Sequence, residues 1–173
     1  MSNIVKLSDD QYPFTYIDHD RLVARGILLN DNNEIALIHI CRNDLFGEAE
    51  YYETPGGGVD EGETPMQAVI REIHEEVGVH AEVIKTLSII DDYYNKIHRH
   101  NINHYFLCRV KLYGHTHRLD YENKWFKEIK WVSIDEAIKL YEEYNKTPIS
   151  KLVYKREVII LKEVKEYMSS SVK

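Results

Sequence analysis

The segment GGVDEGETPMQAVIREIHEEVGV occupies residues 57–79 and decides how the chain is expected to fold. It starts with glycines, which permit backbone conformations closed to other residues and therefore predict a loop. Thr64, Pro65 and Gln67 suit an N-cap, a first helical position and a capping-box partner. Gly78 suits the residue just after a helix end. The pattern predicts one helix that begins at Pro65 and ends just before Gly78.

Apolar runs of strand length lie on both sides of this helix. The runs before it form a predicted hairpin around a polar turn, and they are residues 22–30 and 34–42. The runs after it are residues 81–90, 103–113 and 128–132. The segments between these runs, residues 43–50, 91–102 and 115–124, are predicted loops.

Two further helices are predicted near the end of the chain. Ser133 and Glu136 form a second capping-box pattern, which predicts a helix to about Tyr144. Residues 147–168 form the last predicted helix. Strands and helices in this order indicate helices packed on a mixed sheet. We expect a single domain over residues 1–173, with an N-terminal extension at residues 1–20.

Bulk composition narrows the class of protein. The net charge is −7, so the chain lacks the excess of basic residues that is typical of a nucleic-acid-binding protein. The chain contains no run of about 18 apolar residues, so no transmembrane helix is predicted. The N-terminus lacks the apolar region of a signal peptide, so we expect a cytoplasmic protein. Cys41 and Cys108 lie in apolar runs and are interpreted as buried free thiols in a reducing compartment.

Three carboxylates on the predicted helix are the chemically informative feature. Glu72, Glu75 and Glu76 stand at positions i, i+3 and i+4, which places them on one helix face. Like charges at this spacing repel, and only Arg71 lies close enough in sequence to offset them. A bound hard dication would remove the conflict. Mg²⁺ prefers oxygen ligands and commonly joins carboxylates to substrate phosphates.

The same segment resembles the signature of a known family. It fits Gly-x5-Glu-x7-Arg-Glu-U-x-Glu-Glu-x-Gly-U, where U is bulky and aliphatic, with Gly57, Glu63, Arg71 and the three glutamates in place. This is the box of the Nudix hydrolase family, which the sequence closely resembles. The resemblance implies an α/β fold, an α/β/α sandwich with a mixed β-sheet. It also implies hydrolysis of a nucleoside diphosphate linked to a moiety X.

The resemblance also implies roles for the box residues. The carbonyl of Gly57 and the carboxylates of Glu72, Glu75 and Glu76 are the expected ligands of Mg²⁺, with Mn²⁺ as a substitute. One of these glutamates, with Glu75 as a candidate, could instead be the base that activates water. Arg71 is expected to orient the carboxylates and is counted with the catalytic residues.

A base could also come from outside the box. Many family members supply a further acidic residue from a loop before a late strand, where this chain has Asp120, Glu122 and Glu128. We expect Glu122 to be catalytic because it lies in the polar loop, whereas Glu128 begins a strand. If neither acts, the base lies within the box, at Glu75 or Glu72.

Substrate-binding residues are expected near the glycine loop. Arg42 ends a strand and could meet a phosphate, and Tyr51 and Tyr52 could stack on a base, with solvent exposure and plain packing as the alternatives. Three histidines invite a metal interpretation that no family pattern supports: His98, His100 and His104.

The expected partner is a small-molecule nucleotide, either a (d)NTP or oxidised nucleotide or a nucleotide sugar. ADP-ribose is disfavoured because no proline lies near Tyr93 and Tyr94. A non-catalytic module that senses a nucleotide is the alternative, and the complete set of box carboxylates opposes it. An RNA-decapping enzyme is disfavoured by the net charge of −7. We expect no nucleic-acid or membrane partner, and a homodimer is left open.

Overall fold

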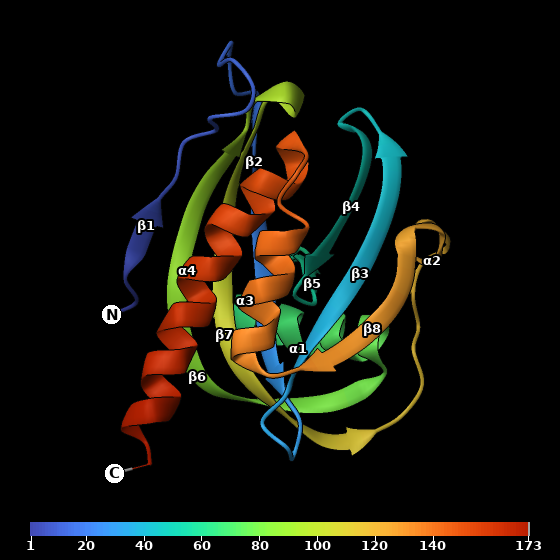
Figure 1. The fold of residues 1–173 in the computed structure, drawn as a ribbon, viewed down its shortest axis with the longest axis vertical. Coiled ribbons are helices and arrows are strands. Elements are labelled where there is room, and N and C mark those ends of the chain that lie inside the picture. Colours follow the sequence, from blue (N-terminus) through green and yellow to red (C-terminus); the bar gives the residue numbers. More distant parts are fainter. Residues whose placement is uncertain (173) are drawn as a thin grey trace.

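The computed structural model describes residues 1–172, apart from the side chains of Tyr121 and Glu122. Helices pack on a strongly twisted sheet (Figure 1). The elements in chain order are β1 (Ile4–Lys6), β2 (His19–Leu29), β3 (Ile35–Asp44), β4 (Gly47–Glu53), β5 (Gly56–Gly58), α1 (Pro65–Val77), β6 (Val79–Tyr94), a 3₁₀ turn (Asn95–Ile97), β7 (Arg99–Tyr113), α2 (Asp120–Trp125), β8 (Phe126–Val132), α3 (Ile134–Glu143) and α4 (Pro148–Ser170). Within the described range, no helix combines the length and apolar character needed to cross a membrane.

The strands form one mixed sheet in the order β1-β6-β7-β2-β3-β4. β7 pairs antiparallel with β6 and parallel with β2, while β5 and β8 pair antiparallel with β2 and β3. The predicted α/β fold with a mixed sheet is therefore confirmed. The short β5 pairs with Val23, Ala24 and Arg25, which places the glycine strand beside the middle of β2.

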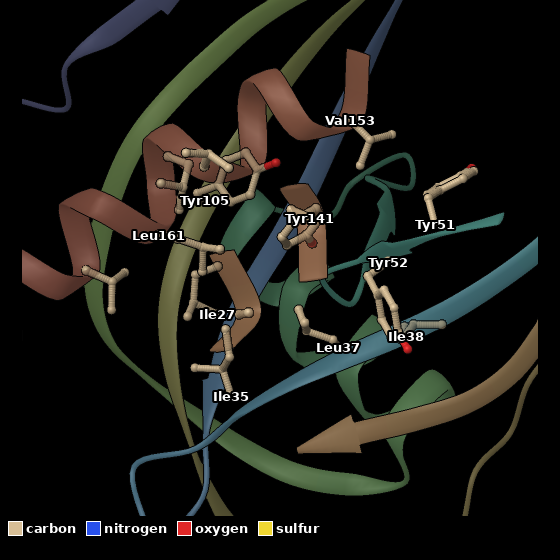
Figure 2. Packing of buried hydrophobic residues seen from close by; sticks show 14 of the residues in the cluster. Ile27, Ile35, Leu37, Ile38, Tyr51, Tyr52, Tyr105, Tyr141, Val153 and Leu161 are labelled. Carbon is tan, nitrogen blue, oxygen red and sulfur yellow. The ribbon is translucent and has the colours of Figure 1, made fainter. Parts of the chain in front are cut away.

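Each face of the sheet has its own apolar core. One face meets α1, and its core includes Ala24, Leu28, Ala68, Val69 and Ile73. The other face is covered by α3 and α4, and the packing around Ile27, Leu37, Tyr105, Tyr141 and Leu161 is visible in Figure 2. The sheet lies between two helical layers as a result, which is the layering of an α/β/α sandwich.

Helix α1 has the predicted bounds because its two ends are fixed locally. The Thr64 hydroxyl accepts a hydrogen bond from the Gln67 N–H at 3.2 Å, and the Gln67 side chain accepts one from the Thr64 N–H at 2.9 Å. Gly78 adopts the left-handed conformation with φ of 78° and donates its N–H to the His74 carbonyl. The helix presses on β2, since a Cβ on Gly26 would lie 2.8 Å from Ile73 Cδ1.

Two predicted loops are wrong, and a third is right only over residues 115–119. Residues 43–50 form the turn and flanks of the β3–β4 hairpin, residues 91–102 mostly extend β6 and β7, and residues 115–124 contain the start of α2. Polar residues that pair inside the structure explain the second error. Asp92 and Asn103 are both buried, and the Asn103 amide donates to Asp92 at 2.9 Å. A buried polar pair interrupts the apolar alternation by which a strand is predicted.

Helix α4 is joined to the sheet by a buried ionic network. Arg156 is 1% exposed and pairs with Glu53, which also pairs with Arg25 at 2.7 Å. The adjacent Glu157 is fully buried and accepts a hydrogen bond from the Thr54 hydroxyl at 3.0 Å. Burial alone would raise the pKa of Glu53, but the charges of Arg25 and Arg156 outweigh it, so the pKa is lowered. The network anchors the strand end that leads into the glycine loop.

Gly78→Ala should destabilise the fold more than Gly62→Ala does. Both glycines have positive φ, 78° and 79°, so both variants carry the left-handed penalty of about 1–2 kcal/mol. A Cβ on Gly78 would also lie 2.8 Å from the backbone of His115 and Thr116, whereas Gly62 has open space around it. We expect urea unfolding to show an extra loss of about 1–3 kcal/mol for Gly78→Ala. Equal losses of unfolding free energy in the two variants would show that the segment after β7 moves aside for the added Cβ at no cost.

Candidate active site

A cleft of about 330 Å³ opens where β5, α1 and the arginine-bearing strands meet. The glycines of β5, Glu72 and Glu76 form one wall. The basic residues that line it are Arg21, Arg25, Arg42 and Arg99. An acidic wall and four guanidinium groups therefore share one small cavity.

Glu72 and Glu76 are held against the glycine strand. They are 7% and 5% exposed, which is unusual for carboxylates. The N–H of Gly56 donates to Glu76 Oε2 at 3.2 Å. A Cβ on Gly57 would lie only 2.6 Å from Glu72 Cδ, so a side chain at Gly57 would displace this carboxylate. The glycine at this position is required by close approach of the helix.

Arg71 links the glycine strand to the helix. Its guanidinium donates to both carboxylate oxygens of Glu63, at 2.8 and 3.0 Å, and to the Gly58 carbonyl at 2.9 Å. It also donates to Glu72 at 3.0 Å and to Glu75 at 3.4 Å. The hydrogen bonds to Glu63 are the main cause that raises the pKa of Arg71 above its ordinary value. Arg71 thereby fixes the position of Glu72 from outside the cleft.

Glu75 is placed differently from its two neighbours. It does not line the cleft, and its side chain is 29% exposed beside Arg71. The structure thus brings together Gly57, Glu72 and Glu76 from the expected set and leaves Glu75 at the edge.

The donors at the acidic wall fit a hard divalent cation. Two carboxylates and a nearby backbone carbonyl are the oxygen ligands that Mg²⁺ uses when waters and substrate phosphates complete its shell. Softer donors gather elsewhere. Among the described residues, three or more metal-ligating side chains come within 4.8 Å of one another only at His39, Cys41 and Glu50. Their nitrogen and sulfur donors do not suit Mg²⁺, and His39 already hydrogen-bonds Glu50 at 2.7 Å.

Comparison with known proteins identifies the family. The NUDIX domain model matches residues 20–153, which is well over half of the chain. The chain belongs to the Nudix family. The Nudix box is the segment of residues 57–79 that supplies the glycine strand and α1.

Relatives of this Nudix chain include enzymes that act on nucleotides. An Escherichia coli (strain K12) 8-oxo-dGTP diphosphatase is 46% identical over 57 residues, which cover 33% of this chain and 43% of that protein. An RNA pyrophosphohydrolase of Sphingopyxis alaskensis is 28% identical over 148 residues, covering 75% of this chain and 90% of that protein. The first match therefore spans less than half of its relative, and the second spans most of it.

Solved structures share the fold. A NUDIX hydrolase from Nitrosomonas europaea superposes with a TM-score of 0.64 at 18% identity, covering 88% of this chain and 90% of that one. A C. elegans Ap4A hydrolase superposes with a TM-score of 0.60 at 18% identity, covering 87% and 98%. At this identity the likeness establishes the Nudix fold alone.

Two of the expected substrate-binding residues line the cleft of the Nudix domain. The Arg42 guanidinium donates to the Tyr51 hydroxyl at 3.1 Å and lies 4.5 Å from the centroid of the Trp125 ring. Tyr51 lines the cavity but is only 3% exposed, so little of its ring is free to stack on a base. The structure does not bring Tyr52 there. Tyr52 is also 3% exposed and stacks on His39, with ring centroids 4.5 Å apart.

The acidic residues outside the box that were candidates for the base differ in where they lie relative to the cleft. Glu128 lies directly opposite His39 in the β3–β8 ladder, and its carboxylate is 3.5 Å from His39 Nδ1. Ile40, the next residue of β3, lines the cleft. Side chains alternate along a strand, so Glu128 lies on the face turned away from the cleft. Asp120 is exposed and does not line the cleft, and the side chain of Glu122 lies outside the described residues.

Several residues of the cleft were not anticipated. Arg21, Arg25, Arg99 and Trp125 line it together with the box. Arg25 had a signal in sequence, because it interrupts the apolar run LVARGILL of residues 22–29. Arg21 and Arg99 had none, because only the parallel pairing of β2 with β7 brings them together. The three histidines noted in sequence are not gathered into a metal-ligating group in the described part of the chain.

Arg71→Lys should weaken metal binding without unfolding the protein. Lysine retains the charge but cannot bridge Glu63, the Gly58 carbonyl and Glu72 at once. Millimolar Mg²⁺ should raise the melting temperature of the wild type, because an ion that binds only the native site stabilises it by mass action. In Arg71→Lys the apparent Mg²⁺ affinity should fall by about 10- to 100-fold, the usual effect of losing a group that orients metal ligands.

Arg109→Lys is the matched control for this titration. Arg109 bonds to the Asn30 carbonyl at 3.2 Å, in the turn region between β2 and β3, and lies outside the cleft. Its Mg²⁺ affinity should equal that of the wild type. If wild-type melting is insensitive to Mg²⁺, the assignment of the metal to this wall is wrong.

Proposed function

We propose that this Nudix chain is a divalent-metal-dependent hydrolase that cuts the phosphoanhydride bond of a nucleoside diphosphate linked to a moiety X. The supporting observation is the pairing, in one cleft, of two buried carboxylates with a wall of arginines. The carboxylates suit a metal ion, and the guanidinium groups suit phosphate oxygens. A complete set of box glutamates opposes a role as a non-catalytic sensor.

The residues of the chain have distinct tasks in this mechanism. Glu72, Glu76 and the Gly57 carbonyl would hold Mg²⁺, with Mn²⁺ as a substitute. When bound, the ion neutralises phosphate charge and lowers the pKa of a coordinated water. Arg71 keeps Glu72 in place, and Arg42 contacts the phosphates. A carboxylate accepts the proton of the attacking water, the new O–P bond forms, and the anhydride oxygen departs with the leaving phosphate.

The substrate is proposed to be a (d)NTP, an oxidised nucleotide or a nucleotide sugar. Similar proteins are named as an 8-oxo-dGTP diphosphatase, an RNA pyrophosphohydrolase and an Ap4A hydrolase, and a diphosphate, a pyrophosphate and Ap4A all contain phosphoanhydride bonds. We further propose a cytoplasmic location, because the free thiols of Cys41 and Cys108 agree with a reducing compartment. Cys41 is partly exposed, contrary to the expectation that both thiols are buried.

A substrate panel tests the proposal directly. The purified protein is incubated with nucleoside triphosphates, 8-oxo-dGTP, nucleotide sugars and dinucleoside polyphosphates, with Mg²⁺ or with a chelator. We expect hydrolysis of at least one class, with turnover abolished by the chelator. Product analysis identifies the bond that is cut. Absence of turnover on the whole panel with Mg²⁺, and again with Mn²⁺ in its place, would contradict the proposed hydrolase.

Glu76→Gln should lower turnover on the best substrate by at least about 100-fold, the usual scale for a lost metal ligand or acid–base group. Glutamine has nearly the same size and retains an oxygen to accept the Gly56 N–H, so the fold should persist. Glu82→Gln is the control, because Glu82 is an exposed residue that pairs with Lys111 on the β6–β7 ladder. Near wild-type activity of a folded Glu76→Gln protein would remove Glu76 from the site.

Glu122→Gln and Glu128→Gln distinguish the candidate bases outside the box. If Glu122 is the base, its substitution should reduce kcat strongly, remove the acidic limb of the pH–rate profile and leave Mg²⁺-dependent stabilisation intact. Glu128→Gln should be silent, because Glu128 lies on the far face of β8 beside His39. If both variants are silent, the base lies in the box, at Glu75 or Glu72.

A further inference from the structure

Among the described residues, two of the four cleft arginines have no acidic group in ion-pair contact. Arg25 pairs with Glu53 at 2.7 Å, and Arg42 donates to Asp44 at 2.6 Å. No described carboxylate lies within 4.0 Å of the guanidinium of Arg21 or Arg99. Arg21 is exposed and Arg99 is half-buried, and described carboxylates do not neutralise either charge by direct contact, although the protein has a net charge of −7.

The parallel pairing of β2 with β7 places these two arginines on one face. His19 lies opposite Arg99 and Arg21 lies opposite Asn101, so Arg21 and Arg99 have the same parity along the ladder. Both line the cleft. Arg21 also reaches the glycine strand, since a Cβ on Gly58 would lie 3.5 Å from Arg21 Nη2. The pair is therefore adjacent to the wall that carries Glu72.

The Arg99 side chain has no hydrogen-bond partner among the described residues, although its backbone lies in the β7 ladders. Its guanidinium lies 5.3 Å from the centroid of the Tyr94 ring, and its buried Nε has no acceptor among the described residues. Burial and the neighbouring charge of Arg21 lower the pKa of Arg99 to about 10. The group still carries its charge at neutral pH, but at an electrostatic cost. A bound anion would supply both the missing acceptor and the missing charge.

We propose that Arg21 and Arg99 form a subsite for a terminal phosphate, next to the phosphates at the metal wall, and so select substrates with an uncapped 5′-polyphosphate. This inference rests on the proposed hydrolase function and narrows its substrate class. A terminal phosphate carries about two negative charges at neutral pH. Two unpaired guanidinium groups match that charge. Each phosphate of a nucleotide sugar carries a single charge and has no free end.

Substrate preference gives the first test. Kinetics are measured for the wild type, Arg21→Gln, Arg99→Gln and the double variant with a nucleoside triphosphate and a nucleoside diphosphate sugar of the same base. The ratio of kcat/KM for triphosphate over sugar should favour the triphosphate in the wild type. It should fall at least about 10-fold in each single variant, mainly through KM for the triphosphate. Arg109→Gln, outside the cleft, is the control and should keep the wild-type ratio.

Binding gives a second test that needs no turnover. Inorganic tripolyphosphate is titrated calorimetrically into the Mg²⁺-loaded wild type and into the double variant, with circular dichroism to check folding. We expect the double variant to bind at least about 10-fold more weakly, and Arg99→Lys to recover part of the affinity that Arg99→Gln loses.

Three outcomes would overturn the subsite. They are equal tripolyphosphate affinity in the wild type and the double variant, an unchanged substrate ratio, and wild-type hydrolysis of nucleotide sugars without triphosphates. The last result would leave the proposed hydrolase function intact. Failure of the hydrolase proposal would appear differently, as no turnover of any substrate while the tripolyphosphate titration still reports on the subsite.

Discussion

The close approach of α1 to the glycine strand is the constraint on which the rest of the site depends. Glu72 occupies the space that any side chain at Gly57 would fill, and Glu76 accepts the Gly56 N–H. Burying two carboxylates side by side is unfavourable unless hydrogen bonds or cations compensate. Here the Gly56 N–H and Arg71 supply part of that compensation, and the proposed metal ion would supply the rest. The contact of the helix with Gly26 on β2 and the left-handed Gly78 at its end set the depth at which the carboxylates lie.

The charge of the whole chain is a poor guide to the charge of its cleft. A net charge of −7 argues weakly against polyanionic partners, yet four arginines line the cavity. The acidic residues that dominate the sum lie mostly elsewhere, for instance in surface pairs such as Glu82 with Lys111. A phosphate approaching the cleft is affected mainly by the nearest groups, because charges more than about 10 Å away are largely screened by salt. The charges that line the cleft therefore affect phosphate binding more than the net charge of the chain does.

The features that the sequence predicted well are those whose causes are local. The bounds of α1 follow from Thr64, Pro65 and Gly78, each of which acts on its immediate neighbours. The features that could not be predicted from the sequence depend on how the strands pair and in which register. Arg21 and Arg99 are 78 positions apart and share a face only because β2 and β7 pair in parallel. Tyr51 and Tyr52 looked equivalent in sequence, but the alternation along β4 turns only Tyr51 toward the cleft.

The ionic network of α4 has an evolutionary consequence. Removing one member of a buried charge pair leaves the other unsolvated, at a cost of about 3–5 kcal/mol, whereas replacing the whole group by apolar residues can be neutral. Glu53, Arg25 and Arg156 should therefore covary among relatives, either all charged or all replaced. Arg156 lies just past residue 153, where the family match ends. Arg25 and Glu53 line the cleft, so the cleft is coupled to a helix position just outside the matched segment, and substitutions there are expected to occur as coupled sets.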